Sequence, residues 1–451
     1  MKLRMTGSQH SELNSHLFPG DMKEAVAFAL CGRRGSDVLV VQQVIPIPYE
    51  DCDRHTNYIT WRTDALVPVL EAAEKSGLGV MKIHSHPGGY SNFSAQDDRA
   101  DAELFPSIHD WIESTLPHAS AIMLPEGRVF GRSVDARGAM APLELVSVVG
   151  TDIQFYPHQL GNVPDFALRN GQAFGAKTTK LMSKLKVAVV GCSGTGSPLI
   201  EALARHGIGH LVLIDPDKIG IENLNRILNA TTEDLGRLKV DVAGDAVERM
   251  GLGTTVERIP TNLLTPDAVR AVAGCDVVFG AMDGAEGRHY LNRLATCYGL
   301  PYFDVGVRLI ADGRGGVEQI CGSVHYLEPG GSSLLSRNAI TMAQVDAEAL
   351  RRTDPEEYER RREERYISGV NEAAPAVISV NMHYASLAVL EFLARVHPYR
   401  DDPNDAFAQF GSSLTQYYFY NEAHPEPCAA LARYLGKGDL VPLLNMPALS
   451  E

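Results

Sequence analysis

Residues 84–97 of the chain read His-Ser-His-Pro-Gly-Gly-Tyr-Ser-Asn-Phe-Ser-Ala-Gln-Asp, and this stretch decides the fold around it. The apolar residues 80–83 just before it predict a β-strand, which Pro87 should end. Because residues i and i+2 of a strand point to the same face, the side chains of His84 and His86 can hold one metal ion.

The end of the same stretch predicts the start of a helix. Ser94 and Asp97 have the spacing of a capping box, which favours a helix through Leu104. Taken separately, the two patterns indicate a helix cap and a surface histidine pair. Taken together, two imidazoles and one carboxylate are the ligands of a catalytic zinc site that keeps one position for water.

The pattern His-x-His-Pro-x6-Ser-x2-Asp resembles the motif of the JAMM (JAB/MPN) metalloisopeptidases over about residues 20–135. The positions that take the family's zinc-binding role are His84, His86 and Asp97. The resemblance further implies that Ser94 helps to hold the tetrahedral intermediate and that an upstream glutamate is the general base. Glu24, before an apolar run that ends at a glycine, fits that role, and Glu12 is the weaker alternative.

A second pattern begins at residue 185. The apolar run 185–190 predicts a buried parallel strand, followed by a turn that contains Gly191, Gly194 and Gly196. A helical stretch and a second apolar strand that ends at Asp215 would complete a βαβ unit. Phosphates can bind at the N-terminus of such a helix, and the aspartate can reach a ribose. The turn alone fits a nicotinamide dehydrogenase equally well.

The polar residues that follow favour ATP chemistry over hydride transfer. They are Asp217, Asn223, Arg226, Lys239 and, after a predicted strand at 276–282, Asp283 with Arg288. Two carboxylates can hold Mg²⁺, while arginine and lysine can neutralise a triphosphate.

This array resembles the ThiF/HesA/MoeB-type family, the adenylation domain shared with ubiquitin-activating enzymes, over about residues 160–395. The resemblance implies that Asp215 binds the ribose and that Asp217 lies near the metal. The residues implied to contact ATP and Mg²⁺ are Asn223, Arg226, Lys239 and Asp283. Arg169 would reach into the partner subunit's site in a homodimer formed through this domain. The implied reaction is adenylation of the C-terminal glycine of a small ubiquitin-like protein.

The chain departs from this family where many members have a zinc-binding Cys-x-x-Cys. Residues 333–336 read Ser-Leu-Leu-Ser instead, so we expect that structural zinc to be absent. Many members also carry a nucleophilic cysteine nearby, but residues 322–424 contain none. Cys428 is the one cysteine that we expect to be exposed. Cys192, at a helix N-terminus, should have a depressed pKa even if it only fills the turn.

Three alternatives for the acyl group therefore stay open. The adenylate passes directly to an acceptor, or a cysteine takes the acyl group as a thioester, or a hydroxyl takes it as an oxyester. The candidate cysteines are Cys428 and Cys321, and the candidate serines are Ser332, Ser333, Ser336 and Ser368.

Composition bounds these interpretations. The chain has 451 residues, of which 45% are hydrophobic, and a formal net charge of −15. That charge argues against nucleic-acid and anionic-membrane partners. No signal peptide or membrane-spanning run is evident, and seven unpatterned cysteines fit a reducing cytoplasm.

We expect an α/β protein with a JAB/MPN domain, a mixed sheet flanked by helices, followed by a Rossmann-like adenylation domain. The expected divisions are a zinc isopeptidase domain at 1–140, a linker and leading helix at 141–180, an adenylation domain at 181–400 and a C-terminal extension at 401–451. The Arg- and Glu-rich residues 351–365 indicate a solvated helix or a mobile cover over the adenylation site.

The resulting hypothesis is a bifunctional enzyme of a bacterial-type ubiquitin-like pathway. It would adenylate the C-terminal glycine of the modifier with ATP and Mg²⁺, and hydrolyse peptide or isopeptide bonds after that glycine with Zn²⁺. A conjugating enzyme is a possible further partner. One alternative is a sulfur-carrier activating enzyme with a processing peptidase, and another is a binding scaffold with one inactive domain.

Overall fold

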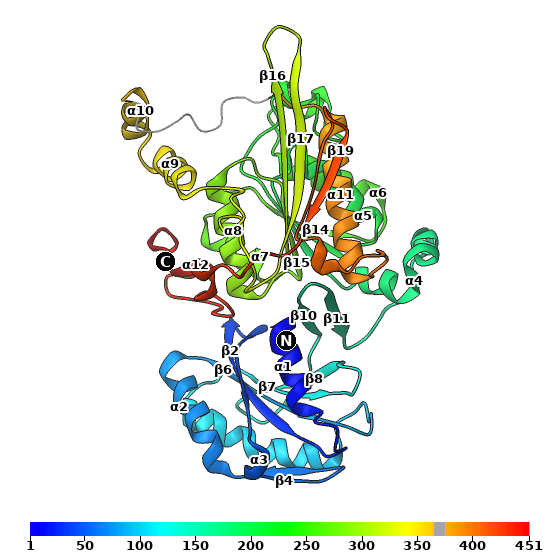
Figure 1. Ribbon diagram of the computed structural model, residues 1–451, viewed down its shortest axis with the longest axis vertical. Coiled ribbons are helices and arrows are strands. Elements are labelled where there is room, and N and C mark those ends of the chain that lie inside the picture. Colours follow the sequence, from blue (N-terminus) through cyan, green and yellow to red (C-terminus); the bar gives the residue numbers. More distant parts are fainter. Residues whose placement is uncertain (365–374, 451) are drawn as a thin grey trace. The chain divides into compact units, whose positions relative to one another are not determined.

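The computed structural model describes residues 1–364 and 375–450, which form two compact units (Figure 1). Unit 1 comprises Met1–Gln159, Cys297–Gly299 and Tyr434–Leu440, and unit 2 comprises the other described residues. Within the described ranges, every helix is too short or too polar to cross a membrane.

Unit 1 is built on a nine-stranded mixed sheet with the order β11-β10-β1-β3-β2-β6-β7-β8-β9. These strands are β1 (Lys2–Thr6), β2 (Val26–Arg34), β3 (Val38–Pro46), β6 (Gly79–Ser85), β7 (His118–Met123), β8 (Val129–Val134), β9 (Met140–Pro142), β10 (Leu145–Val149) and β11 (Ile153–Pro157). A separate hairpin consists of β4 (Cys52–Arg54) and β5 (Ile59–Trp61).

Alternation along β2 explains why helices cover both faces of this sheet. Ala27 and Ala29 belong to one buried cluster, which includes residues of α1 (Gly7–Leu17), whereas Phe28 belongs to a second cluster with α2 (Val67–Ser76) and α3 (Ala95–Ile112). Successive strand residues point to opposite faces, so a wholly apolar strand needs a helix on each side.

Unit 2 contains an eight-stranded sheet with the order β14-β13-β12-β15-β16-β17-β18-β19. Its parallel part consists of β12 (Lys186–Val190), β13 (His210–Ile214), β14 (Thr255–Ile259), β15 (Val277–Gly280) and β16 (Tyr302–Ala311). Its antiparallel part adds β17 (Val317–Leu327), β18 (Gln409–Ser413) and β19 (Tyr418–Glu422). The parallel strands have the order of a Rossmann-type half. Strands β13 and β14 are added on one side of β12 and strands β15 and β16 on the other, so the strand order reverses between β12 and β15.

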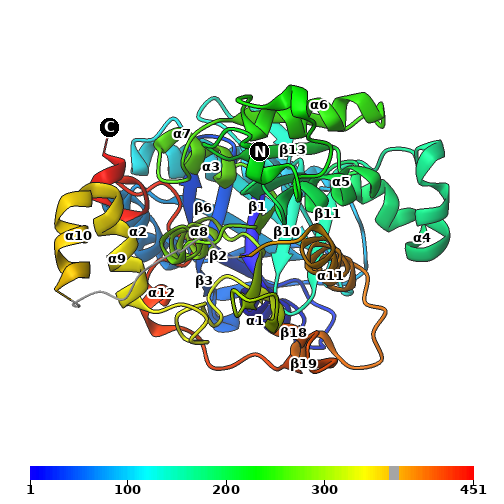
Figure 2. The ribbon, with the colours of Figure 1, turned by 90° about the horizontal axis from the view of Figure 1, so that it is seen from above.

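The helices of unit 2 are α4 (Leu168–Met182), α5 (Gly196–Arg205), α6 (Lys239–Met250), α7 (Pro266–Ala273), α8 (Ala285–Tyr298), α9 (Met342–Thr353), α10 (Pro355–Glu363), α11 (Ile378–Val396) and α12 (Ala429–Ala432). The last residues of α8 are counted with unit 1. Helices α5 and α11 lie side by side, as do α9 and α10 (Figure 2). The α/β fold expected for both parts of the chain is therefore confirmed.

Several local predictions also hold. The strand before His84 and the βαβ unit around the glycine turn are both present. Residues 351–364 differ from the single helix that was expected over 351–365, because α9 ends at Thr353 and a second helix starts at Pro355, while residue 365 lies outside the described residues. Proline at the first position of α10 lacks the N–H that would continue α9.

Candidate functional sites

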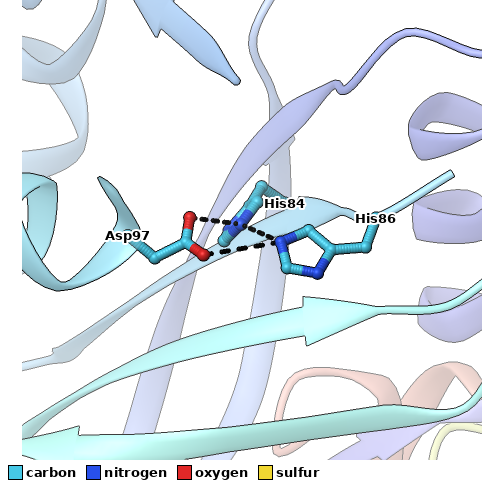
Figure 3. Close-up of side chains that lie close together, drawn as sticks. All are labelled: His84, His86 and Asp97. Carbon is cyan, nitrogen blue, oxygen red and sulfur yellow. Dashed lines mark hydrogen bonds and ion pairs between the residues drawn. The ribbon is translucent and has the colours of Figure 1, made fainter. Parts of the chain in front are cut away.

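The three predicted metal ligands of unit 1 lie together (Figure 3). The Nε2 atom of His84 is 3.0 Å from Oδ1 of Asp97 and 3.2 Å from Nε2 of His86. The Nε2 atom of His86 is 3.5 Å from the second carboxylate oxygen. One ligand atom from each residue lies within 4.8 Å of the others, so the three can bind one ion.

Strand β6 and helix α3 bring these side chains together. His84 lies in the strand, and His86 follows its last residue. The Nδ1 of His86 lies 2.7 Å from the carbonyl oxygen of Tyr90, to which it can donate. That hydrogen bond fixes the tautomer and leaves the Nε2 lone pair free for a metal.

Asp97 has two roles in the structure. Its carboxylate accepts a hydrogen bond of 2.6 Å from the Ser94 N–H, and the Ser94 hydroxyl accepts one of 3.2 Å from the Asp97 N–H. The predicted capping box is thus present and starts α3. The helix cap is confirmed, and the metal-ligand interpretation stays a prediction that this geometry fits, because the residue that caps the helix also faces the histidines.

Glu24 lies beside this cluster. Strand β2 pairs with β6 so that Val26 is opposite His84. Glu24, two residues earlier, therefore lies on the same face at the level of His86. The carboxylate is only 5% exposed, and burial raises its pKa to about 7, with Asp97 adding to the shift and His86 opposing it. Glu12, the weaker alternative, is exposed on α1.

The charge state of the cluster suits a cation. Burial alone would raise the pKa of Asp97, but hydrogen bonds to His84 and His86 hold it well below its usual range. Burial lowers the pKa of His84, which keeps that imidazole neutral at pH 7. Burial opposes the protonation of His86, but its hydrogen bonds to Asp97 and to the Tyr90 carbonyl raise its pKa. One carboxylate and two imidazoles, with a buried glutamate nearby, match the donor set of catalytic zinc.

The glycine turn of unit 2 is sterically required. Gly191 has a φ of +94°, and a Cβ there would lie 2.6 Å from the carbonyl oxygen of Ala281. A Cβ on Gly196 would lie 1.8 Å from the carbonyl oxygen of Gly191. The turn is fixed by a hydrogen bond of 2.7 Å from the Cys192 N–H to the Asp215 carboxylate. Burial raises the pKa of the Cys192 thiol far above its ordinary value, so the depressed pKa expected at a helix N-terminus is wrong.

A cavity of about 610 Å³ lies at the carboxyl ends of β12, β13, β14 and β15, where the strand order reverses. Open parallel sheets bind ligands at this place. The predicted residues that line it are Gly191, Asp215, Asp217, Asn223, Arg226, Lys239 and Asp283. Gly194 and Gly196 belong to the glycine turn but do not line the cavity. Arg169, near the start of α4, is exposed and does not line it either.

The charged and polar groups of the cavity form hydrogen bonds or ion pairs with each other or with nearby backbone groups. The Lys239 ammonium lies 2.8 Å from Asp217 and 4.0 Å from Asp215. Arg226 donates to the carbonyl oxygen of Glu222 at 2.6 Å, and Asn223 accepts from the Gly220 N–H at 3.0 Å. Burial raises the pKa of Asp215, and Lys239 opposes this effect. These groups would have to exchange partners when a ligand enters.

Sequence reasoning missed several residues of the cavity lining, among them Glu286 and Glu348. Glu348, on α9, lines the wall, and its carboxylate accepts from the Glu286 N–H at the start of α8 at 2.8 Å. Arg352 forms an ion pair of 2.7 Å with the Glu286 carboxylate. No spacing rule in the sequence links residues this far apart. Arg288 instead binds the buried Asp304, at 2.5 Å.

The candidate acyl acceptors are enclosed to different degrees. Ser333 and Ser336 bond reciprocally, each hydroxyl accepting from the other's N–H at 2.9 and 3.1 Å, and Ser333 is buried. Cys428 is 6% exposed and its N–H bonds to the Gly331 carbonyl, which corrects the expectation that it is exposed. The polar residues that surround Cys428 along the chain do not indicate this tertiary contact. Cys321 is partly exposed, Ser332 is buried and accepts from Arg337, and Ser368 lies outside the described residues.

Comparison with known proteins agrees with both halves of this description. A model of the ThiF family matches residues 167–426, and a model of prokaryotic homologs of the JAB domain matches residues 8–131. The chain belongs to the ThiF family and carries an N-terminal JAB domain.

Two curated relatives match shorter segments. The sulfur carrier protein adenylyltransferase of Thermus thermophilus is 29% identical over 127 residues, 28% of this chain and 47% of that protein. The SAMP-activating enzyme E1 of Haloferax volcanii is 34% identical over 116 residues, 26% of this chain and 43% of that protein. The chain thus spans less than half the length of these relatives. A crystal structure of E. coli MccB with MccA-N7isoASN is 17% identical with a TM-score of 0.47, and covers 60% of this chain and 75% of that one.

Proposed function

We propose that the chain is a bifunctional enzyme that activates a ubiquitin-like protein and also hydrolyses the bond after its C-terminal glycine. Residues 181–400 would adenylate the glycine carboxylate, and residues 1–140 would act as the peptidase. The observation that carries this proposal is that each unit holds a complete donor set, the His84–His86–Asp97 cluster in one and the lined cavity in the other.

Hydrolysis would take place at the cluster of unit 1. His84, His86 and Asp97 would hold zinc, which when bound lowers the pKa of a coordinated water and polarises the scissile carbonyl. Glu24, buried with a pKa of about 7, is suited to accept a proton near neutral pH and to donate it to the leaving amine. The Ser94 hydroxyl retains its own proton while it accepts the helix N–H, so it can donate to an oxyanion.

Adenylation would take place in the cavity of unit 2. The glycine turn and the start of α5 offer backbone N–H groups to the phosphates of ATP. Asp215 would bind the ribose, and Asp217 and Asp283 would hold Mg²⁺. Arg226, Asn223 and Lys239 would neutralise the triphosphate while the carrier carboxylate attacks the α-phosphate and pyrophosphate leaves. Arg169 would act in the neighbouring subunit of a homodimer.

A second candidate is supported by the name of one relative, a sulfur carrier protein adenylyltransferase. In this case the adenylate would be converted to a thiocarboxylate, and the peptidase would only mature the carrier. A thiocarboxylate adds the mass difference between sulfur and oxygen to the carrier, so intact mass in the presence of a sulfur donor separates the two candidates.

The central test uses the full chain with the substitution His84→Ala, Mg²⁺, ATP and a ubiquitin-like protein that ends in glycine. We expect the carrier to gain the mass of AMP, or the enzyme to gain the mass of the carrier. An adduct cleaved by thiol would be a thioester, whereas one cleaved only by hydroxylamine would be an oxyester. Absence of both adducts and of ATP–pyrophosphate exchange would contradict the activating role and favour a scaffold with one inactive domain.

A further inference from the structure

A network of buried charges lies directly beneath the metal cluster. Lys82 is two residues before His84 on β6, and Asp101 is one turn after Asp97 on α3. The Lys82 ammonium and the Asp101 carboxylate form an ion pair, and both side chains are almost completely buried. The strand and the helix thus meet at two successive levels, an ion pair below and the metal ligands above.

Arg132, on β8, connects this ion pair to the start of α3. Its Nε and Nη2 donate to the Asp101 carboxylate at 3.0 and 2.7 Å, and its Nη1 lies 2.5 Å from Asp98. Its guanidinium also stacks on the ring of Phe93, 3.8 Å from the ring centre. Phe93 directly precedes the cap residue Ser94, so the three contacts surround the turn that carries Asp97.

Stability alone does not explain these charges. Removing the three charged groups of Lys82, Asp101 and Arg132 from water costs several kcal/mol per ion, and well-packed hydrophobic residues in place of such networks are often equally or more stable. What the network supplies is a defined orientation of α3 relative to strands β6 and β8. A guanidinium that donates through three nitrogens fixes the rotation of the helix more narrowly than hydrophobic contacts do.

We infer that Arg132 is a positioning residue for the metal centre, and that it holds the first turn of α3 at the angle at which Asp97 faces His84 and His86. The inference rests on the hydrolytic part of the proposed function. Arg132 does not contact the ligands, so it would act through the orientation of the helix.

The substitution Arg132→Lys tests this role in the full chain. Lysine keeps the positive charge but has a single nitrogen. It cannot bond to the Asp98 and Asp101 carboxylates together as the three guanidinium nitrogens do. The control is Arg128→Lys, at the exposed residue just before β8, whose side chain forms no hydrogen bond or ion pair with α3 in the described part of the chain. Three quantities are measured: zinc affinity by competition with a chromogenic chelator, kcat and KM on a carrier with a peptide extension, and the melting temperature.

We expect Arg132→Lys to bind zinc about 10-fold more weakly and to lower kcat about 10-fold, with KM within about twofold, because partners outside the ligand set commonly change metal affinity by this factor or more. The Arg128 control should match the wild type. A purely structural role would lower the melting temperature and leave zinc affinity and kcat of the folded protein unchanged, and this result would overturn the inference.

A second variant keeps the test decisive if Arg132→Lys does not fold. The triple substitution Lys82→Met, Asp101→Leu and Arg132→Met removes the buried pair together with its clamp and should remain folded while zinc affinity falls at least about 10-fold. Wild-type zinc affinity in the triple variant would contradict the inference. If the wild type hydrolyses no carrier, the hydrolytic proposal fails, but the zinc measurements still decide the role of Arg132.

Discussion

The two sites differ in how they are held. In unit 1 the ligands come from a strand and a long helix, are mostly buried, and already face one another. In unit 2 the charged groups come from the segments that follow β13 and β15 and from the first residue of α6, and bond to each other or to nearby carbonyl groups. The geometry of the first site would accept an ion without rearrangement, whereas the groups of the second would have to exchange internal partners for those of a ligand.

This contrast indicates where each site is sensitive. A preformed cluster depends on every one of its members, since none can be replaced by rearrangement. A cavity lined by mutually neutralised charges spreads the same task over more residues. A substitution at one site should leave the activity of the other unchanged, because the residues of each site belong to a single unit.

The largest effect is expected for His84→Ala. Loss of one of three ligands should reduce bound zinc to background, and hydrolysis of an extended carrier should fall by about 10³-fold or more. ATP–pyrophosphate exchange should remain at the wild-type rate. Metal analysis of the purified protein and the two activity assays check this, and a zinc-free variant that still hydrolyses would disprove the metal mechanism.

Glu24→Gln should come next. The amide fills the same volume but cannot accept a proton, so hydrolysis should fall by about 10² to 10⁴-fold. Unlike His84→Ala, this variant should keep its zinc. Zinc content and the single-turnover rate, measured on the same sample, separate the role of metal ligand from that of general base. Near-normal hydrolysis would contradict the role of Glu24 and leave Glu12 as the candidate base.

Lys239→Met tests the other site. Removal of one cation that faces the cavity should reduce ATP–pyrophosphate exchange by about 10²-fold, and hydrolysis should not change. A loss of both activities would mean that the two units do not act independently, and would contradict the contrast drawn above.

Ser94→Ala should have the smallest effect on the fold, about 1 kcal/mol from loss of the helix cap. Hydrogen exchange at the first turn of α3 should accelerate. Hydrolysis should fall because the same turn carries Asp97 and because the proposed oxyanion donor is lost. Thr341→Ala is the matched control, since Thr341 caps α9 with the same box in unit 2. It should loosen α9 to a similar extent and leave hydrolysis unchanged; equal effects of the two substitutions on hydrolysis would be inconsistent with a local role for Ser94.

The sequence predicted what is encoded over short distances. Both the ligand spacing and the capping box lie within fourteen residues, where strand and helix geometry determine which side chains converge. The βαβ unit was equally readable, because a continuous apolar strand and a glycine turn have few alternatives. The location of Asp215 beside the turn follows from that topology.

What depends on distant parts of the chain was not predicted. The network of Lys82, Asp101 and Arg132 joins three elements, and each residue alone looks like an ordinary surface charge. Strands β10 and β11 carry few sequence signals, yet they extend the sheet of unit 1 beside β1. Glu348 reaches the cavity only because α9 is placed against the start of α8.

The Ser-Leu-Leu-Ser turn at 333–336 has a consequence for the conditions under which this protein can work. Reciprocal hydrogen bonds between Ser333 and Ser336 close the turn with the protein's own hydroxyls, which chelators do not remove and mild oxidants do not consume. Metal starvation or peroxide stress would therefore leave this turn of unit 2 intact, while starvation would deprive the cluster at His84 of the zinc that we propose for it.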